Sequence, residues 1–414
     1  MSDLSFIDAA LTSARPQAIG ALLRYFRDLD RAEEAFQEAC LRALKTWPVN
    51  GPPRDPAAWL ILVGRNFALD ETRRFRRTEE LPPEDMISDR DDAESDLAER
   101  LDSAHYRDDV LRLLFVCCHP DLPATQQIAL ALRIVSGLTV AQIARAFLVS
   151  ESAMEQRITR AKSRIARAAV PFEAPGAIER ATRLAAVAAM LYLVFNEGYS
   201  ASGDGAAMRA ALCDEAIRLA RLLLRLFPAE PEIMGLAALL MLQHARAPAR
   251  IDTDGSIVLL EDQDRSLWDA ARIGEGTRIL DRATRLRRPG PYQLQAAIAA
   301  CHAAASEASD TDWAEIAVLY SALGRYEPSP VVHANRAVAV AKVEGPAAGL
   351  AILDELRGDG RAEGWHLLHA CRADLLRRLG RTAEARDAYR AALALDPPPA
   401  EREFLAGRLA ELDR

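Results

Sequence analysis

LTVAQIARAFLVSESAMEQRITRAKSRI, residues 138–165, is the stretch of sequence that decides the fold. It predicts two helices, one from Thr139 to Phe147 and another that starts after a short break at Leu148–Ser150. In the second helix, apolar residues recur at i, i+4, i+7 and i+11, a spacing that forms one buried helical stripe. The stripe consists of Met154, Ile158, Ala161 and Ile165.

The opposite face of this second helix is polar and basic. A helix that buries one face and presents such groups on the other suits the major groove of DNA. An ordinary helical hairpin with a solvated face has the same pattern, so both interpretations stay open at this point. Two starts also fit, because Ser150 suits an N-cap while Ser152 with Glu155 fits a capping box. The polar and basic residues are Ser152, Glu155, Gln156, Arg157, Thr159, Arg160, Lys162, Ser163 and Arg164.

Length and composition indicate an all-α protein of two or three domains, because the chain has 414 residues, 50% of them hydrophobic, and few aromatics. We expect no secretory signal, since Asp3 and Asp8 interrupt the N-terminus. The apolar run from Leu184 to Phe195 is too short to span a membrane. The six cysteines form no C-x-x-C pair, which favours reduced thiols in a cytoplasmic protein.

The net charge of −8 is distributed unevenly along the chain. Residues 1–78 carry 12 basic and 10 acidic side chains, and residues 110–170 carry 8 basic and 3 acidic ones. Residues 79–109, between these weakly basic blocks, carry 13 acidic and 3 basic side chains. With Pro82 and Pro83, this charge density predicts an extended linker. It is either a solvated spacer or an acidic segment that imitates a nucleic-acid backbone in a basic channel.

The first basic block is predicted to be helical. In DLDRAEEAFQEACLRALKTW, Glu34, Gln37 and Glu38 share one exposed stripe beside Asp30 and Glu33, which by itself is a solvated helix face. The apolar residues at helical spacing between positions 18 and 47 are Leu22, Leu23, Phe26, Ala35, Phe36, Ala39, Leu41 and Leu44.

A second helix, Ala57 to Arg77, is predicted after the proline-rich break WPVNGPPRDP. Trp59, Val63 and Phe67 are candidates for its core face. It ends in RRFRR, whose arginines suit phosphates and whose aromatic suits an unstacked base. A basic helix end also complements the helix dipole, and this alternative stays open.

Together these segments resemble a bacterial RNA polymerase sigma factor of the extracytoplasmic-function type, in the sigma-70 superfamily. The match covers about residues 10–170 and keeps the order and spacing of region two and region four. It implies that residues 1–78 bind the polymerase clamp and melt the −10 promoter element. It also implies that residues 110–170, after the linker, bind the polymerase flap and read the −35 element. Such a factor is not an enzyme and needs no cofactor.

The resemblance also implies functional residues. A trapped base favours strand separation because flipping it costs about a few kcal/mol, and arginine and glutamine suit guanine and adenine in the major groove. The clamp-docking residues are Asp30, Glu33, Glu34, Gln37 and Glu38. The −10 residues are Asn50, in the base-capturing loop, with Arg65, Asn66, Arg73, Arg74 and Arg77. The −35 residues are Ser152, Glu155, Gln156, Arg157, Arg160 and Arg164. The chain departs from the family at Gln142, often acidic there, and near Leu148, often glycine.

Residues 171–414 form a helical extension by pattern. HACRADLLRRLGRTAEARDAYRAALALDP resembles a tetratricopeptide repeat, with NRAVAVAKVEGPAAGLAILDEL as an earlier copy and CDEAIRLARLLLRLFP as a weaker one. Stacked repeats leave a concave surface for a regulatory protein, although a plain helical array without a ligand fits equally. The layout resembles the sigma-factor subgroup with such an extension, whose motifs fall at YLVFNEGYSAS and LLEDQDRSLWD.

Other segments that resemble functional sites give weaker evidence of function. Cys117-Cys118-His119 continues an apolar helix and lacks the second ligand pair of a tetrahedral metal site, so we expect no metal. The stretch 252–262 has its glycine in the wrong place for a calcium loop and favours a small hairpin. Three functions therefore compete: a promoter-specificity subunit, a helix-turn-helix regulator with a repeat-type sensor, and a helical scaffold. The promoter-specificity subunit is favoured, because the other two functions give no role to the acidic helix or to RRFRR.

Overall fold

The fold is built from helices in two compact units, Met1–Glu197 and Gly198–Arg414. The described part of the chain contains no sheet, only an isolated bridge at Ile251. This confirms the all-α prediction. The computed structural model describes residues 3–76, 103–119, 121–147, 149–167, 177–199, 206–252, 258–356 and 360–412.

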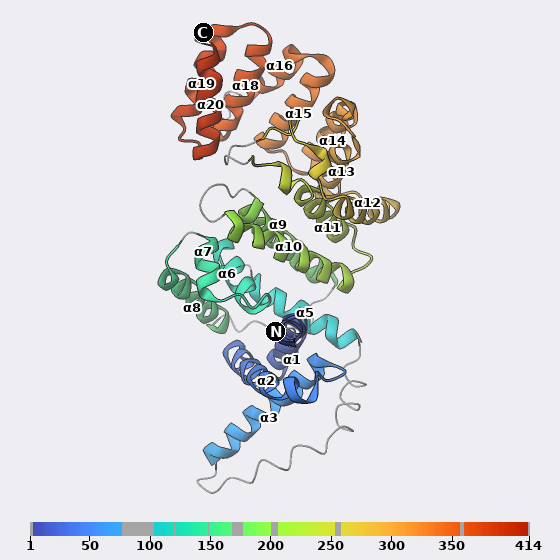
Figure 1. The fold of residues 1–414 in the computed structure, drawn as a ribbon, viewed down its shortest axis with the longest axis vertical. Coiled ribbons are helices and arrows are strands. Elements are labelled where there is room, and N and C mark those ends of the chain that lie inside the picture. The colour runs from blue at the N-terminus through green and yellow to red at the C-terminus, as the bar shows by residue number, and fades with distance from the viewer. Residues whose placement is uncertain are drawn as a thin grey trace. The chain divides into compact units, whose positions relative to one another are not determined.

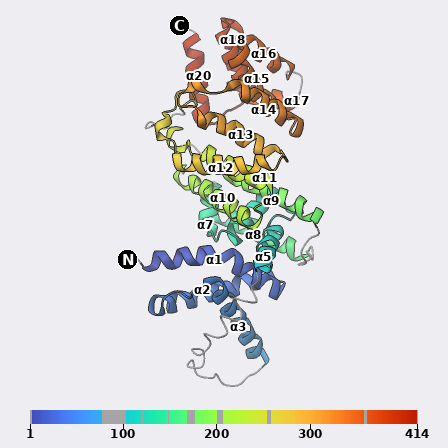
Figure 2. The same ribbon diagram turned by 90° about the vertical axis from the view of Figure 1, so that its right-hand side faces the viewer.

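Three helices open the first unit: α1 (Asp3–Phe26), α2 (Leu29–Asn50) and α3 (Pro56–Arg76). Each packs against the other two, and Figure 2 shows α1 and α2 side by side. The chain turns between α1 and α2 because the Asp28 side chain accepts a hydrogen bond from the Arg31 amide (3.0 Å) and caps the new helix.

The core face of α2 differs in part from the prediction. Leu41 and Leu44, expected in the apolar set, are 54% and 46% exposed because they lie opposite the buried stripe. In α3, Trp59, Val63 and Phe67 are only partly buried. The buried hydrophobic residues are Leu29, Ala32, Ala35, Phe36, Ala39, Ala43 and Trp47 in α2, and Ala57, Ala58, Leu60 and Ile61 in α3.

Helix α5 (Ser103–Cys117) begins ahead of the predicted domain start at residue 110 and packs on α1. Gly20 allows this approach, since a Cβ there would lie 2.7 Å from the Asp109 carbonyl oxygen. The buried Asp109 carboxylate pairs with Arg112 (2.8 Å) and with Arg24 of α1 (3.4 Å). Helix α5 therefore joins the two sigma-like segments. Residues 77–102, most of the predicted linker, lie outside the described part of the chain.

Three further helices complete the predicted helix-turn-helix region: α6 (Ala124–Ile134), α7 (Val140–Ala146) and α8 (Glu151–Arg167). They pack on one another, and α8 also contacts α2. Helix α9 (Ala177–Tyr199) follows, and all of it up to Glu197 belongs to the first unit. The compact unit thus extends well beyond the expected boundary at residue 171.

Helices of the second unit follow one another as a succession of packed pairs (Figure 1). Tight turns at positive-φ glycines separate the paired helices near its end, at Gly345 (φ 96°) and Gly380 (φ 73°). The helices are α10 (Ala206–Leu226), α11 (Pro231–His244), α12 (Ala270–Arg285), α13 (Pro291–Ala304), α14 (Trp313–Tyr326), α15 (Pro330–Glu344), α16 (Pro346–Glu355), α17 (Gly360–Glu363), α18 (His366–Arg378), α19 (Thr382–Ala394) and α20 (Pro399–Leu412).

The predicted repeat near the C-terminus forms the helix pair α18 and α19. Its small and aromatic positions Ala385, Tyr389 and Ala392 are at most 2% exposed. The earlier copy forms α15 and α16, and Leu353, which aligns with Tyr389, is fully buried. Both pairs share one apolar core, as expected for stacked repeats.

Candidate nucleic-acid interface

Helix α8 has the two faces that its sequence predicts. Met154, Ile158, Ala161 and Ile165 are buried. The helix begins at Glu151, and the Ser150 hydroxyl accepts a hydrogen bond from the Ala153 amide (3.2 Å). Ser150 is therefore the cap, which settles the choice between the two predicted starts.

The turn before α8 is held by the backbone. The Val149 amide donates to the Ala144 carbonyl oxygen (3.0 Å). Leu148, the residue before Val149, lies outside the described residues. Gln142, where the family often has an acidic residue, caps the start of α7. Its side chain accepts from the Thr139 amide (2.8 Å), while its own amide donates to the Thr139 hydroxyl (3.1 Å), which makes a complete capping box.

The predicted −35 residues lie together on the open side of α8. Arg157 is half-buried. Arg160 donates to the Gln156 side chain (3.3 Å), and Arg164 donates to the Asp121 carbonyl oxygen (3.2 Å). Ser152, Glu155, Gln156, Arg160 and Arg164 are exposed. The face therefore combines hydrogen-bonding groups for base edges with cations for phosphates.

The predicted −10 residues come from the end of α2 and from α3. Asn66 is exposed, and the Arg65 guanidinium lies over the Tyr25 ring of α1, 4.5 Å from its centroid. Asn50 is the last residue of α2. Arg73 and Arg74 belong to α3, where the structure describes only the backbone, and Arg77 lies outside the described residues.

The loop between α2 and α3 is anchored at both ends. The Asp55 carboxylate accepts from the amides of Ala57 and Ala58 (3.0 Å each), which caps α3. Trp47 and Trp59 meet edge to face with ring centroids 5.4 Å apart. The base-capturing loop predicted from the sequence thus begins and ends on packed helices.

Four of the five predicted clamp-docking residues are accessible on α2. Asp30, Glu34 and Gln37 are exposed. Glu38 is half-buried, and its Oε1 lies 3.5 Å from Arg42 Nε. Glu33 differs, because it is only 5% exposed and is surrounded by cations from other helices. Glu33 is therefore covered by neighbouring helices, and its role in clamp docking stays a prediction.

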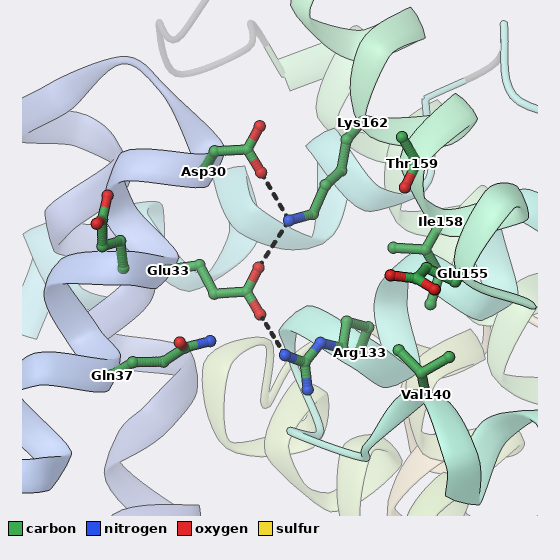
Figure 3. A pocket seen from close by; sticks show the side chains of 10 residues that line it. Asp30, Glu33, Gln37, Arg133, Val140, Glu155, Ile158, Thr159 and Lys162 are labelled. Atoms are coloured by element: carbon green, nitrogen blue, oxygen red, sulfur yellow. Dashed lines mark hydrogen bonds and ion pairs between the residues drawn. The ribbon is translucent and has the colours of Figure 1, made fainter. Parts of the chain in front are cut away.

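Sequence reasoning missed the cations around Glu33. Arg133 of α6 and Lys162 of α8 lie 3.1 Å and 2.8 Å from its carboxylate oxygens (Figure 3), and Arg15 of α1 lies at 3.8 Å. No local signal identifies them, because all three lie on other helices, and Arg133 and Lys162 are a hundred or more positions from Glu33. The hydrogen bonds to Asp30 and Glu33 raise the pKa of Lys162 despite its partial burial, whereas burial lowers the pKa of Arg15.

An apolar extension of the α2 stripe was also missed. Leu41, Leu44 and Val49 are exposed on the helix that carries Glu34 and Gln37, with Val49 at 82%. Leu41 and Leu44 appear in the apolar periodicity of the sequence, which was the available signal, but that periodicity was assigned to the core. Exposed apolar side chains of this size, beside acidic ones, are typical of a protein-binding surface.

The cysteine pair, the predicted hairpin and the extension motifs have structural roles in the described residues. Cys117 and Cys118 are buried, and burial raises the pKa of both thiols, that of Cys118 to about 12. The tip of the predicted hairpin, residues 253–257, lies outside the described residues, although the Val258 amide donates to the Arg250 carbonyl oxygen (2.9 Å). In the extension motif YLVFNEGYSAS, the Tyr199 ring is covered by the Arg250 guanidinium, whose Cζ lies 3.7 Å from the ring centroid.

Comparison with known proteins assigns these segments to families. Residues 11–78 match sigma-70 region 2, residues 112–165 match sigma-70 region 4, and residues 372–399 match a tetratricopeptide repeat. Residues 183–284 match a family of unknown function (DUF6596). An uncharacterized protein of Rhizobium meliloti (strain 1021) is 65% identical over 412 residues, which cover 100% of this chain and 97% of that protein.

The two sigma-70 matches coincide with α1–α3 and with the helices from α5 to α8 that position the two predicted DNA faces. They point to a non-catalytic initiation factor that interacts with core RNA polymerase and promoter DNA. Within the described residues, no helix combines the length and apolar character needed to cross a bilayer. The chain therefore belongs to the extracytoplasmic-function sigma factors of the sigma-70 superfamily, which recognise promoters and initiate transcription, and it carries a tetratricopeptide-like extension.

Proposed function

We propose a division of labour among the surfaces of this sigma factor. The open face of α8 reads the −35 element, with Gln156 and Arg160 at base edges and Arg164 at a phosphate. The observation that supports this assignment is the exposed polar and basic face of α8, directly opposite its buried apolar stripe. Such a helix offers the groove hydrogen bonds without exposing its core residues.

The second surface is the exposed stripe of α2, which docks on the clamp of core polymerase. It combines the acidic and amide groups of Glu34 and Gln37 with the apolar Leu41 and Leu44. Apolar area supplies affinity, while the carboxylates select a basic partner. Arg73 and Arg74 at the end of α3, with Asn50, hold the −10 strand.

The third assignment concerns the extension. Its stacked helix pairs offer surface to a regulatory protein, and we assign it a role in modulating initiation. The factor acts in the cytoplasm, where polymerase and chromosome lie.

Run-off transcription with purified core polymerase tests the proposal, on a promoter template chosen by sequencing polymerase-bound DNA. Arg160→Ala should lower the transcript about tenfold or more, because a good base contact contributes about 1–3 kcal/mol. Its binding to core polymerase should stay unchanged. Arg167→Ala, which removes an exposed charge from the same helix, is the matched control. Absence of any promoter-dependent transcript, with tight duplex binding by the chain alone, would instead support a stand-alone helix-turn-helix regulator.

A further inference from the structure

Helix α12 of the second unit carries arginines along its exposed side. Residues 278–288, at the end of the helix and in the turn after it, include five arginines and one acidic residue, Asp281, in a chain whose net charge is −8. The helix buries Ile279, Leu280 and Ala283 on its other side and packs against α11 (Figure 1). The exposed arginines, called the arginine row below, are Arg278, Arg282, Arg285, Arg287 and Arg288.

The arginine row borders an open groove between α12 and α10. The groove has a volume of about 490 Å³, and Glu275 of α12 is part of its lining. Arg221 of α10 donates to the two carboxylate oxygens of Glu275 from its Nε (2.9 Å) and its Nη2 (2.6 Å). Because Arg221 neutralises Glu275, the groove keeps a net positive charge. Its other charged lining residues are Arg278, Asp281, Arg282 and Arg285.

Most of the arginine row lacks an acidic partner. Arg282, Arg285 and Arg287 form no ion pair with any carboxylate that the structure describes. Arg278 donates only to the Gly274 carbonyl oxygen of its own helix (3.0 Å), and Arg288 lies 3.6 Å from Glu230. Like charges three or four positions apart on a helix repel one another. The row therefore destabilises the free chain, and a bound polyanion would remove this repulsion.

The turn after α12 holds one of these arginines in a conformation that favours glycine. Arg287 has a φ of 53°, and its amide donates to the Thr284 carbonyl oxygen (3.0 Å). Glycine is the usual residue at this position after a helix, because a Cβ disfavours the left-handed region. The turn is fixed, since the buried Gln293 side chain donates to the Arg288 carbonyl oxygen (2.7 Å). The backbone alone thus gives no reason for an arginine at position 287.

The phosphates of duplex DNA fit this surface better than an acidic protein does. From Arg278 to Arg285 the row extends about 10 Å along the helix axis, which equals about three phosphate intervals of about 3.4 Å on one strand. Guanidinium groups bind phosphate oxygens in pairs. Protein interfaces instead depend on apolar and aromatic side chains at their centre. Among residues 278–288, Leu286 is the one large apolar side chain that is exposed (41%).

We propose that the arginine row of α12 is a further DNA-binding surface of this sigma factor, which binds the phosphate backbone of a duplex without reading its sequence. Contacts of this kind fix position and supply affinity but carry no sequence information. The extension thereby contributes a DNA contact of its own, in addition to the −10 and −35 contacts of the first unit. This role does not depend on which residues of α8 read the −35 element.

The test uses the full-length chain with Arg282→Gln and Arg285→Gln together. The matched control combines Arg325→Gln and Arg378→Gln, because these exposed arginines also lie in the last turns of their helices, α14 and α18. Binding to a labelled duplex that lacks a promoter is measured by fluorescence anisotropy from about 50 to 200 mM salt. Each phosphate contact contributes about −0.9 to the slope of log affinity against log salt.

We expect the Arg282→Gln/Arg285→Gln variant to have a slope that is shallower by about 2 and an affinity about tenfold lower at low salt. The control variant should keep the wild-type slope. Arg287→Gly should weaken duplex binding as well, while its melting temperature stays equal or rises because glycine relieves the left-handed turn. A merely structural role for Arg287 would instead lower the melting temperature and leave the slope unchanged. Thermal melting of every variant verifies that it is folded.

Two results would overturn this role of the arginine row. The first is absence of duplex binding by the wild type, or the same slope for the α12 variant and the control. The second is unchanged duplex binding with weaker binding to core polymerase, because the row would then serve an acidic protein surface. Since the duplex contains no promoter, neither result bears on the −35 assignment of α8, which the run-off assay tests separately.

Discussion

Glu33→Gln and Glu34→Gln should affect stability very differently, although the two residues are neighbours and lose the same charge. Glu33 is 5% exposed and lies within 4 Å of three cations, whereas Glu34 is exposed. Replacing Glu33 leaves Arg15 and Arg133 without their carboxylate. Lys162 keeps Asp30 as a partner (2.7 Å). Replacing Glu34 removes only a solvated charge.

The magnitude follows from the burial of the partners. Removing one member of a fully buried ion pair costs about 3–5 kcal/mol. The side chains of Arg133 and Lys162 are still 25% and 20% exposed, so water compensates part of the loss. We therefore expect Glu33→Gln to lower the free energy of unfolding of the first unit by about 2 kcal/mol. For a unit of this size, that loss lowers the melting temperature by about 4–8 °C.

Differential scanning calorimetry of the full-length chain measures both variants, with the transition of the first unit followed in each. Glu34→Gln should stay within about 1 °C of the wild type, because exposed charges contribute little. Equal melting temperatures for the two variants would refute the reasoning, since Glu33 would then be solvated like its neighbour. A double-mutant cycle with Lys162→Gln should give a coupling energy of about 1 kcal/mol or more if the two side chains are in contact.

Two further predictions concern the second unit. In the first, the chain is truncated after Glu197, where the first compact unit ends. Its rate of transcription initiation in run-off assays should differ from that of the full chain. An unchanged rate would show that the extension does not regulate initiation. Burial, with the charges of Arg246 and Arg265, lowers the pKa of His302 from 6.5 to about 4. The unfolded chain therefore binds the proton more readily, so the stability of the second unit should fall by about 2–3 kcal/mol as the pH drops from about 6.5 to 4. His302→Phe, which keeps a ring against Trp313, should flatten this dependence in pH-dependent urea melts, and an unaltered slope would assign the loss to other groups.

The sequence alone determined what depends on local periodicity and on turn chemistry. The spacing of Met154, Ile158, Ala161 and Ile165 identified the buried face of α8, because residues at such intervals necessarily share one side of a helix. Gly380 and Tyr389 identified the last repeat for the same reason, since one suits a left-handed turn and the other the interface between paired helices. The all-α class followed from these patterns, whereas the two sigma-70 segments were predicted from the resemblance of their sequences to that family.

Only the tertiary structure decided which polar residues are open and which are covered. The sequence predicted the same clamp-docking role for Glu33 and Glu34, yet one is buried among cations and the other is exposed. Leu41 and Leu44 fit the apolar pattern of α2 but lie on its exposed side. The periodicity of a helix defines its faces, but what covers each face depends on helices far away in the chain. At the Glu33 end of α2, these are α6 and α8, more than seventy positions beyond the end of α2, and no local pattern encodes their approach.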